Sequence, residues 1–268
     1  MRRLLVHEAR VHAVPGRELR DLGDSILLHD PSDPEPFWNR LEAVAWPSAP
    51  DAFDRRLAEV GVLFATLGRQ PHIWASPSHD APPDLAARLV ANGFEDVGPG
   101  LLMVTQDDSA AREVLERPLA PATTMERLAA IRGRAAVDLA EAVVSVLLEA
   151  FGVDEARTPG IRGETIASLG DRRFTHYLVR THGEPVAVAR RATFDGVSYL
   201  SSIGTVERAR GRGLGGLVTA AALVDGIAAG SEWVHLGVFS ENVSAFRLYE
   251  RLGFVPSGEP GPDMVLIG

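Results

Sequence analysis

The residues most suited to chemistry lie in the stretch 204–216, where glycines alternate with other residues and arginines flank them. Three of the glycines are spaced two apart: Gly211, Gly213 and Gly215. The run 197–206 before them predicts a strand, and the run 217–229 after them predicts a helix. Glycine lets the backbone pass close to a bulky anion, and the N–H groups of a first helical turn point at that anion. With Arg210 and Arg212 beside it, this loop predicts a phosphate-binding site.

Two common phosphate-binding motifs do not fit this loop. A P-loop requires Lys-Ser or Lys-Thr after its last glycine, whereas Leu214 and Gly215 follow Gly213. A dinucleotide-binding fingerprint requires the opposite glycine spacing and an acidic residue after its second strand. The plain alternative is a tight strand-to-helix turn whose arginines are solvated.

A second cluster of chemically useful residues follows further along the chain. The apolar run 233–239 predicts a strand, which is followed closely by Asn242. The next helix is predicted over 244–252, begins near Ala245 and carries Tyr249, whose hydroxyl can donate a hydrogen bond or a proton.

Taken together, the two clusters resemble the GNAT family of acyl-CoA N-acyltransferases over residues from about 124 to 268. The motifs that carry the resemblance are Arg210-x-x-Gly213-x-Gly215 and Ala245-x-x-Leu248-Tyr249-Glu250-x-x-Gly253-Phe254. The resemblance implies an α/β (α+β) fold with two GNAT-like domains. Each domain would be a mixed, mostly antiparallel twisted sheet flanked by helices. In the C-terminal domain, strands four and five of the sheet would splay apart.

The resemblance also implies the site. Acetyl-CoA would be the co-substrate, and its arm would pair along strand four at residues 204–206. The Val206 N–H would donate to the thioester carbonyl, Asn242 would be a positioning group on the pantetheine arm or on the next strand, and Tyr249 would be the acid for the departing thiolate. The cofactor-contacting set implied in this way is Gly204, Thr205, Val206, Arg210, Gly211, Arg212, Gly213, Leu214, Gly215, Gly216, Asn242, Ala245 and Tyr249. Glu207 departs from the proline that many members carry at its position.

The reaction implied is acyl transfer to a primary amine, either a small molecule or a protein amine. The amine has to lose a proton before it attacks, so a general base is expected. The candidate bases are Glu207, Glu241, Asp154, Glu155 and His235. None of them stands out, and a surface charge is the plainer explanation of each carboxylate. We expect the acceptor cleft near the loop 152–160 and the facing N-terminal domain.

The first part of the chain lacks this machinery. We expect a degenerate GNAT-like domain over 1–106, a connector over 107–122 and the catalytic domain over 123–268. Counting back from the Gly-Phe pairs at 93–94 and 253–254, Leu89 occupies the place of Tyr249 and Pro82 that of Asn242. Strands are expected to close the two domains, over 101–105 and 264–267 respectively. The remaining elements predicted from apolar patterns are strands over 25–29, 73–75, 175–181 and 185–194 and helices over 51–67, 84–92, 135–151 and 162–169.

Composition narrows the class of protein. The chain has 268 residues, 46% of them apolar, and a formal charge of −9, which disfavours a nucleic-acid partner. It has no cysteine, its histidines have no metal-ligand spacing, and no apolar run is long enough to span a bilayer. We therefore expect a cytoplasmic protein with no metal and no membrane partner, for which a homodimer is one allowed assembly. Two rival functions stay open: a non-catalytic acyl-CoA-binding or scaffold protein, and a transferase that acts on an aminoacyl group carried by tRNA.

Overall fold

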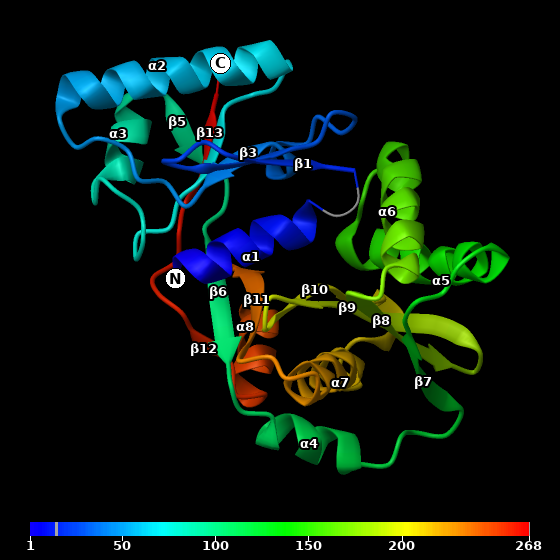
Figure 1. Ribbon diagram of the computed structural model, residues 1–268. Helices are drawn as coiled ribbons and strands as arrows, with labels where there is room; N and C mark the ends of the chain where they lie inside the picture. The colour runs from blue at the N-terminus through cyan, green and yellow to red at the C-terminus, as the bar shows by residue number, and fades with distance from the viewer. Residues whose placement is uncertain (14–15, 268) are drawn as a thin grey trace. The chain divides into compact units, whose positions relative to one another are not determined.

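The computed structural model describes residues 1–13 and 16–267, which form two compact units (Figure 1). The first unit comprises residues 1–102, 238–243 and 256–268, and the second comprises 103–237 and 244–255. Each unit is built around one sheet, so the fold is of the mixed α/β class that the sequence predicts. None of the described helices has the length and apolar composition needed to cross a lipid bilayer.

The first sheet has six strands, which pair antiparallel except where β3 meets β4. In spatial order they are β1 (Glu18–Asp21), β2 (Ile26–His29), β3 (Arg40–Glu42), β4 (His72–Trp74), β13 (Asp263–Leu266) and β5 (Phe94–Asp96). The helical elements of this part of the chain are α1 (Arg2–His12), η1 (Pro36–Trp38), α2 (Pro50–Leu67) and α3 (Leu85–Ala91). Phe53, Val60 and Phe64 form the buried stripe of α2, as its apolar spacing predicts.

The second sheet has seven strands. In spatial order they are β12 (Val255–Pro256), β6 (Gly100–Thr105), β11 (Trp233–Phe239), β10 (Val197–Thr205), β9 (Glu184–Phe194), β8 (Phe174–Thr181) and β7 (Thr123–Leu128). The helical elements that accompany it are α4 (Ser109–Glu116), α5 (Arg134–Phe151), η2 (Glu155–Arg157), α6 (Thr158–Gly170), η3 (Glu207–Ala209), α7 (Leu214–Ala228) and α8 (Val243–Arg251). The strands β7, β8, β9 and β10 pair antiparallel in succession, whereas β10 and β11 are parallel.

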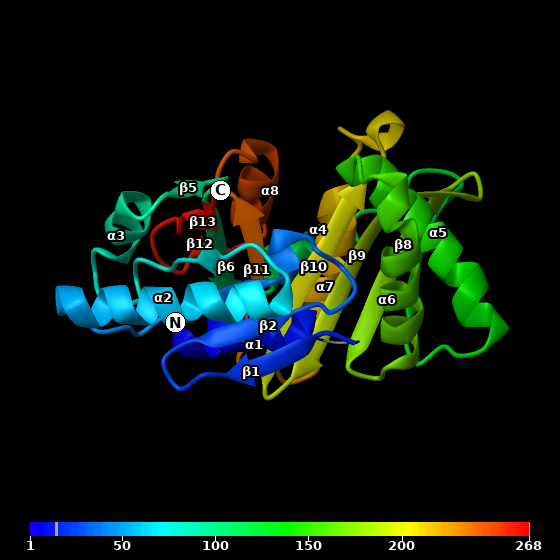
Figure 2. The same cartoon turned by 90° about the horizontal axis from the view of Figure 1, so that it is seen from above.

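Helices cover both faces of the β8–β9–β10 ribbon, where α5 and α6 lie over one face (Figure 2). Successive residues of β9 show the two faces directly. Arg190 bonds Glu164 of α6, and the next residue, Arg191, bonds the carbonyl oxygen of Asp225 in α7. Because side chains alternate along a strand, α7 packs on the face opposite α6.

Two strands lie in sheets other than those expected from the sequence. The predicted closing strand of the first domain, 101–105, is β6 and lies in the seven-stranded sheet between β12 and β11. The predicted last strand of the second domain, 264–267, is β13 and lies in the six-stranded sheet between β4 and β5. The apolar pattern of a strand fixes which side chains are buried but not which sheet accepts its backbone, and this exchange is therefore a finding of the structure.

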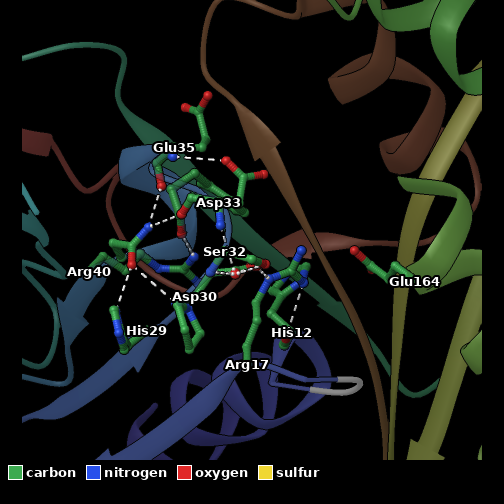
Figure 3. A network of polar contacts seen from close by, with 12 residues as sticks. His12, Arg17, His29, Asp30, Ser32, Asp33, Glu35, Arg40 and Glu164 are labelled. Atoms are coloured by element: carbon green, nitrogen blue, oxygen red, sulfur yellow. Dashed lines mark hydrogen bonds and ion pairs between the residues drawn. The ribbon is translucent and has the colours of Figure 1, made fainter. Parts of the chain in front are cut away.

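In the first unit, a side-chain network holds the loop that follows β2 (Figure 3). One oxygen of the Asp30 carboxylate accepts hydrogen bonds from the backbone and hydroxyl of Ser32, and the other accepts the Arg17 guanidinium at 2.9 Å. Asn39 accepts a bond from the Asp30 N–H and donates to the carbonyl oxygens of Asp33 and Glu35. The loop is thus held by bonds made within itself and to its flanking residues, without a phosphate-binding turn.

A buried charged group lies next to this loop. The Arg40 guanidinium contacts Glu8 at 2.7 Å and Glu42 at 3.3 Å, and all three side chains are fully buried. Burial alone would raise the pKa of Glu8, but Arg40 and His12 lower it to about 2. Burial raises the pKa of Glu42 well above 4.5, and Arg40 only partly opposes that shift. One guanidinium therefore serves two carboxyl groups, and Glu42 is the one that keeps its proton.

We expect Glu42 to make the stability of the protein fall as the pH rises. The folded-state pKa of Glu42 lies above its unfolded value of 4.5, so its favourable contribution is complete below that value and is lost as the pH rises through the folded pKa. Urea unfolding across pH 5–9 should show the free energy of unfolding falling with pH in the wild type, and falling less steeply in Glu42→Gln. The exposed Glu18→Gln is the matched control, and an equal slope in all three proteins would contradict the assignment.

A second prediction tests the exchanged strand. Met264 of β13 is 1% exposed in the core formed by Leu41, Phe64 and Ile73. Met264→Ala should lower the stability of the first unit by about 2–5 kcal/mol through the lost contacts and the cavity. This loss of stability should appear as faster hydrogen exchange in peptides that cover β4. Ile267→Ala, at a side chain that is 47% exposed, should leave that exchange unchanged. Faster exchange in β7 or β8 but not in β4 would show that β13 belongs to the other sheet.

Candidate functional site

The glycine loop joins β10 to α7, as the sequence predicts. Gly211 has φ +73 and Gly213 has φ +78, a left-handed conformation that side-chain-bearing residues adopt only with strain. A Cβ at either position would meet no atom within 4 Å, and both residues are exposed. These glycines are therefore needed for the turn of the backbone, and the space in front of them is open.

The amides that follow are uncovered. Leu217 is the first residue of α7 whose N–H bonds back into the helix, to the carbonyl oxygen of Gly213 at 3.0 Å. Within residues 1–13 and 16–267, the N–H groups of Leu214, Gly215 and Gly216 donate to no acceptor, and no side chain caps the helix. Together with the positive end of the helix dipole they form a site for an anion.

Strands β10 and β11 separate just before this loop. They pair in parallel from Val197 with Trp233 to Leu200 with Leu236. Beyond that point β10 continues to Thr205 and β11 to Phe239 without further pairing between them. The predicted splay between strands four and five of the domain is thus confirmed, and it opens one edge of β10 next to the glycine loop.

The amide that faces this open edge is that of Thr205. The Val206 N–H donates to the carbonyl oxygen of Val186 in β9 at 3.0 Å, so it points into the sheet. Val206 was predicted as the donor to the thioester carbonyl, and its place in the sheet contradicts that role. Hydrogen-bonding directions alternate along an antiparallel strand, and Thr205 pairs with Ala187 without bonding toward it. The Thr205 oxygen accepts the Arg210 guanidinium at 3.2 Å, which agrees with this orientation.

Gly204 has a packing role. It is buried, and a Cβ there would lie 3.0 Å from the Cβ of Ala150 and 3.4 Å from the ring of Phe151. Any larger residue would therefore push the end of α5 away from β10. Within the predicted cofactor-binding set, Gly204 acts by letting these two elements approach each other.

The tyrosine motif lies near the glycine loop within the second unit. Leu248 of α8 would be 3.8 Å from a Cβ at Gly215 and 3.9 Å from one at Gly216. Tyr249, the next residue, is 6% exposed, and its ring lies 6.1 Å from that of Phe254. Burial raises the pKa of Tyr249 to about 12. The structure thus brings the two motifs together and makes the tyrosine a weaker acid than a solvated one.

The other predicted site residues lie in the turn after β11 and at the start of α8. Asn242 is exposed in the turn after β11, where its N–H donates to the carbonyl oxygen of Phe239 at 2.9 Å. Ala245 is half-buried in the first turn of α8. Their predicted roles stay predictions.

Among the candidate bases, Glu207, Glu241, Asp154 and Glu155 are all exposed. The Asp154 carboxylate accepts the N–H of Ala156 at 2.8 Å, so it caps a short 3-10 helix. His235 is fully buried, with its ring 4.8 Å from that of Tyr199. None of the five combines burial with access to the open edge of β10.

Arg190 of β9 is a buried charged residue. It is 4% exposed, and its guanidinium bonds Glu164 of α6 and, at 3.1 Å, the Ser201 hydroxyl of β10. This places a half-buried carboxylate near the point where β10 leaves β11. The sequence held no signal for it, because the pairing joins residues from a helix and two strands. The described part of the chain has no group of three His, Asp or Glu side chains that could hold a metal ion.

Comparisons with known proteins agree with this geometry. A model of the acetyltransferase (GNAT) family matches residues 140–254, which contain the glycine loop, the split strands and Tyr249. Residues 140–254 therefore belong to the GNAT acetyltransferase family. A search of curated proteins found no match.

Solved structures extend the likeness in fold to nearly the whole chain. A GCN5-related N-acetyltransferase from Kribbella flavida superposes with a TM-score of 0.70 at 22% identity, over 97% of this chain and 95% of that one. A tandem GNAT protein from the clavulanic acid biosynthesis pathway superposes with a TM-score of 0.63 at 17% identity, over 96% of this chain and 86% of that one. A functionally unknown conserved protein from Staphylococcus epidermidis superposes with a TM-score of 0.69 at 12% identity, over 96% of this chain and 95% of that one. At these identities the likeness shows the fold, which is that of GNAT acyltransferases.

The uncovered amides predict that the loop binds a diphosphate anion. Inorganic pyrophosphate at ten times its dissociation constant should stabilise the wild type by about 1.4 kcal/mol in thermal unfolding. Gly213→Asp should abolish the stabilisation, since its carboxylate fills the anion's space and repels it, while aspartate tolerates the left-handed backbone. Gly230→Asp is the matched control, because Gly230 lies at the other end of α7 with φ +84 and equally open space. If pyrophosphate stabilised both variants equally, the glycine loop would not be the site that binds the anion.

Proposed function

We propose that the protein is an N-acetyltransferase that moves the acetyl group of acetyl-CoA to a primary amine by direct attack. The observation that carries the proposal is the row of uncovered amides at the start of α7, next to the open edge of β10. The loop would hold the diphosphate of coenzyme A, and the pantetheine arm would run between β10 and β11. The family match over 140–254 supports the class of reaction.

Thr205 takes the role first assigned to Val206 in this proposal. In the reaction the amine nitrogen bonds to the thioester carbon, an oxyanion forms, and the thiolate of coenzyme A leaves. A fixed N–H aimed at that oxygen is worth roughly 3–4 kcal/mol, by comparison with the removal of one oxyanion donor elsewhere. The Thr205 N–H faces the open edge, whereas the Val206 N–H is bonded to Val186.

Tyr249 is proposed as the group that meets the departing thiolate. With a pKa of about 12 against about 8.5 for a thiol, full proton transfer is uphill by about 5 kcal/mol. The tyrosine therefore stabilises the thiolate by donating a hydrogen bond, and the proton follows late. A lysine-like amine must also lose a proton, at a cost of about 4.6 kcal/mol at pH 7.

The rival function is an acyl-CoA-binding protein without activity, which would keep the loop but not need the tyrosine hydroxyl. A panel of small amines and amine-bearing peptides, with acetyl-CoA and detection of the released thiol, separates the two. The proposal expects turnover with at least one amine. Binding of acetyl-CoA without release of thiol on any amine would favour the rival.

With an amine from that panel, Tyr249→Phe should lower kcat by about 100-fold, the lower end for a positioned acid. Tyr177→Phe is the matched control. Tyr177 is also buried, and its hydroxyl bonds Asp225 at 2.9 Å on the α7 face of the sheet. Its loss should reduce thermal stability and leave kcat unchanged. Unchanged kcat in Tyr249→Phe would remove the hydroxyl from the mechanism.

A further inference from the structure

Arg210 is the first residue of the motif that defines the loop, yet its side chain turns away from the uncovered amides. Its Nε donates to the carbonyl oxygen of Thr205 at 3.2 Å, and a terminal nitrogen donates to that of Ala150 at 3.1 Å. Among the described residues it has no carboxylate partner. The side chain thus links the end of β10 to the end of α5.

The other two arginines of the loop are placed differently. Arg208 pairs with Glu149 at 2.7 Å. Arg212 stands between the two left-handed glycines, is exposed, and makes no hydrogen bond or ion pair with any residue of the described chain. Of the three, Arg212 is the one whose charge is available to an incoming phosphate.

We propose that Arg210 is a positioning residue that orients the Thr205 carbonyl group at the end of β10, while Arg212 supplies the cationic contact to the diphosphate. The inference rests on the proposed function. From the sequence, both arginines are expected to contact the phosphate. The inference keeps that role for Arg212 and gives Arg210 an effect on the acyl carbonyl instead.

The physical reason lies in the backbone of β10. The N–H and C=O of one residue in a strand point to the same side, so the Thr205 oxygen faces the open edge together with its N–H. An uncompensated carbonyl oxygen beside a developing oxyanion would repel it. The Arg210 guanidinium donates to that oxygen at 3.2 Å, and a bond from a charged donor is stronger than one between neutral groups. It therefore fixes the Thr205–Val206 peptide, which directly follows the donating N–H in the strand, and it neutralises the repulsion in the same contact.

Gly204 completes this arrangement. Because Gly204 has no side chain, the end of α5 lies against β10, with Ala150 within 3.0 Å of where a Cβ would be. This contact brings the Ala150 carbonyl oxygen within reach of Arg210. The same guanidinium is then held at two points by two separate nitrogens, a rigid planar fork that a lysine ammonium lacks.

The test uses acetyl-CoA labelled with ¹³C at its carbonyl carbon, bound to the full-length protein. Four proteins are compared: wild type, Arg210→Met, Arg210→Lys and Arg212→Met. The dissociation constant is measured by calorimetry, the carbonyl resonance by NMR, and kcat with an amine from the panel. Circular dichroism and thermal unfolding establish that each variant is folded.

We expect Arg210→Met to shift the bound carbonyl resonance toward its value in free acetyl-CoA and to lower kcat by about 10- to 100-fold, as misplacement of a reacting group does. Its dissociation constant should change by less than about threefold, because its charge does not meet phosphate in this arrangement. Arg212→Met should raise the dissociation constant by about tenfold and keep the wild-type resonance. Arg210→Lys should fall between Arg210→Met and the wild type.

An equal rise in dissociation constant for Arg210→Met and Arg212→Met, with the carbonyl resonance unmoved, would overturn the inference and make both arginines phosphate ligands. An unchanged resonance and kcat in a folded Arg210→Met would also overturn it. If the wild type does not bind acetyl-CoA, the proposed function fails and the inference falls with it. That outcome is distinct, because it is seen in the wild type before any variant is compared.

Discussion

The structure of the second unit depends on one constraint: β10 must leave its partner β11 after Leu200 and lead into a helix whose first amides have no partner among the residues that the structure describes. Each half of this arrangement carries a cost, because an open strand edge and uncovered N–H groups both leave hydrogen-bonding capacity unused. Both costs are offset if a ligand supplies a backbone-like arm for the edge and an anion for the helix. The edge and the amides are adjacent in the chain, so one extended molecule with a diphosphate can satisfy both.

The surrounding elements serve that constraint in different ways. The antiparallel pairing of β10 with β9 continues as far as Thr205. This pairing decides which amides of β10 point away from β9, toward its open edge. Gly204 lets α5 approach the strand, and Arg210 ties the two together through backbone oxygens. On the other side of the loop, Leu248 brings α8 against the start of α7, and with it the buried Tyr249. Positions that are distant in the sequence therefore fix the orientation of a few peptide groups.

The first unit is held together by a different set of interactions. Its loop after β2 is held by Asp30 and Asn39, whose side chains accept hydrogen bonds from backbone N–H groups of the loop. Its interior contains the buried group of Glu8, Arg40 and Glu42. Such a group contributes little net stability when intact but is costly to break, so it acts to define the packing of α1 on the sheet.

The sequence by itself determined the local parts of this protein. The strand 197–205, the left-handed glycines and the helix after them follow from residue types, since the backbone angles and apolar spacing that they favour are local properties. Helices α2, α5 and α7 follow from their apolar patterns for the same reason, whereas α1 was missed because half of its buried positions are His and Glu.

Only the tertiary structure decided which amide of β10 faces outward, because that depends on the register with β9 and shifts by one residue with the bulge between Ser201 and Gly204. It also decided that β6 and β13 lie in each other's expected sheets, and that Arg190 is buried against Glu164. These features depend on partners far away in the chain, and a strand's own pattern does not encode which partner its backbone will find.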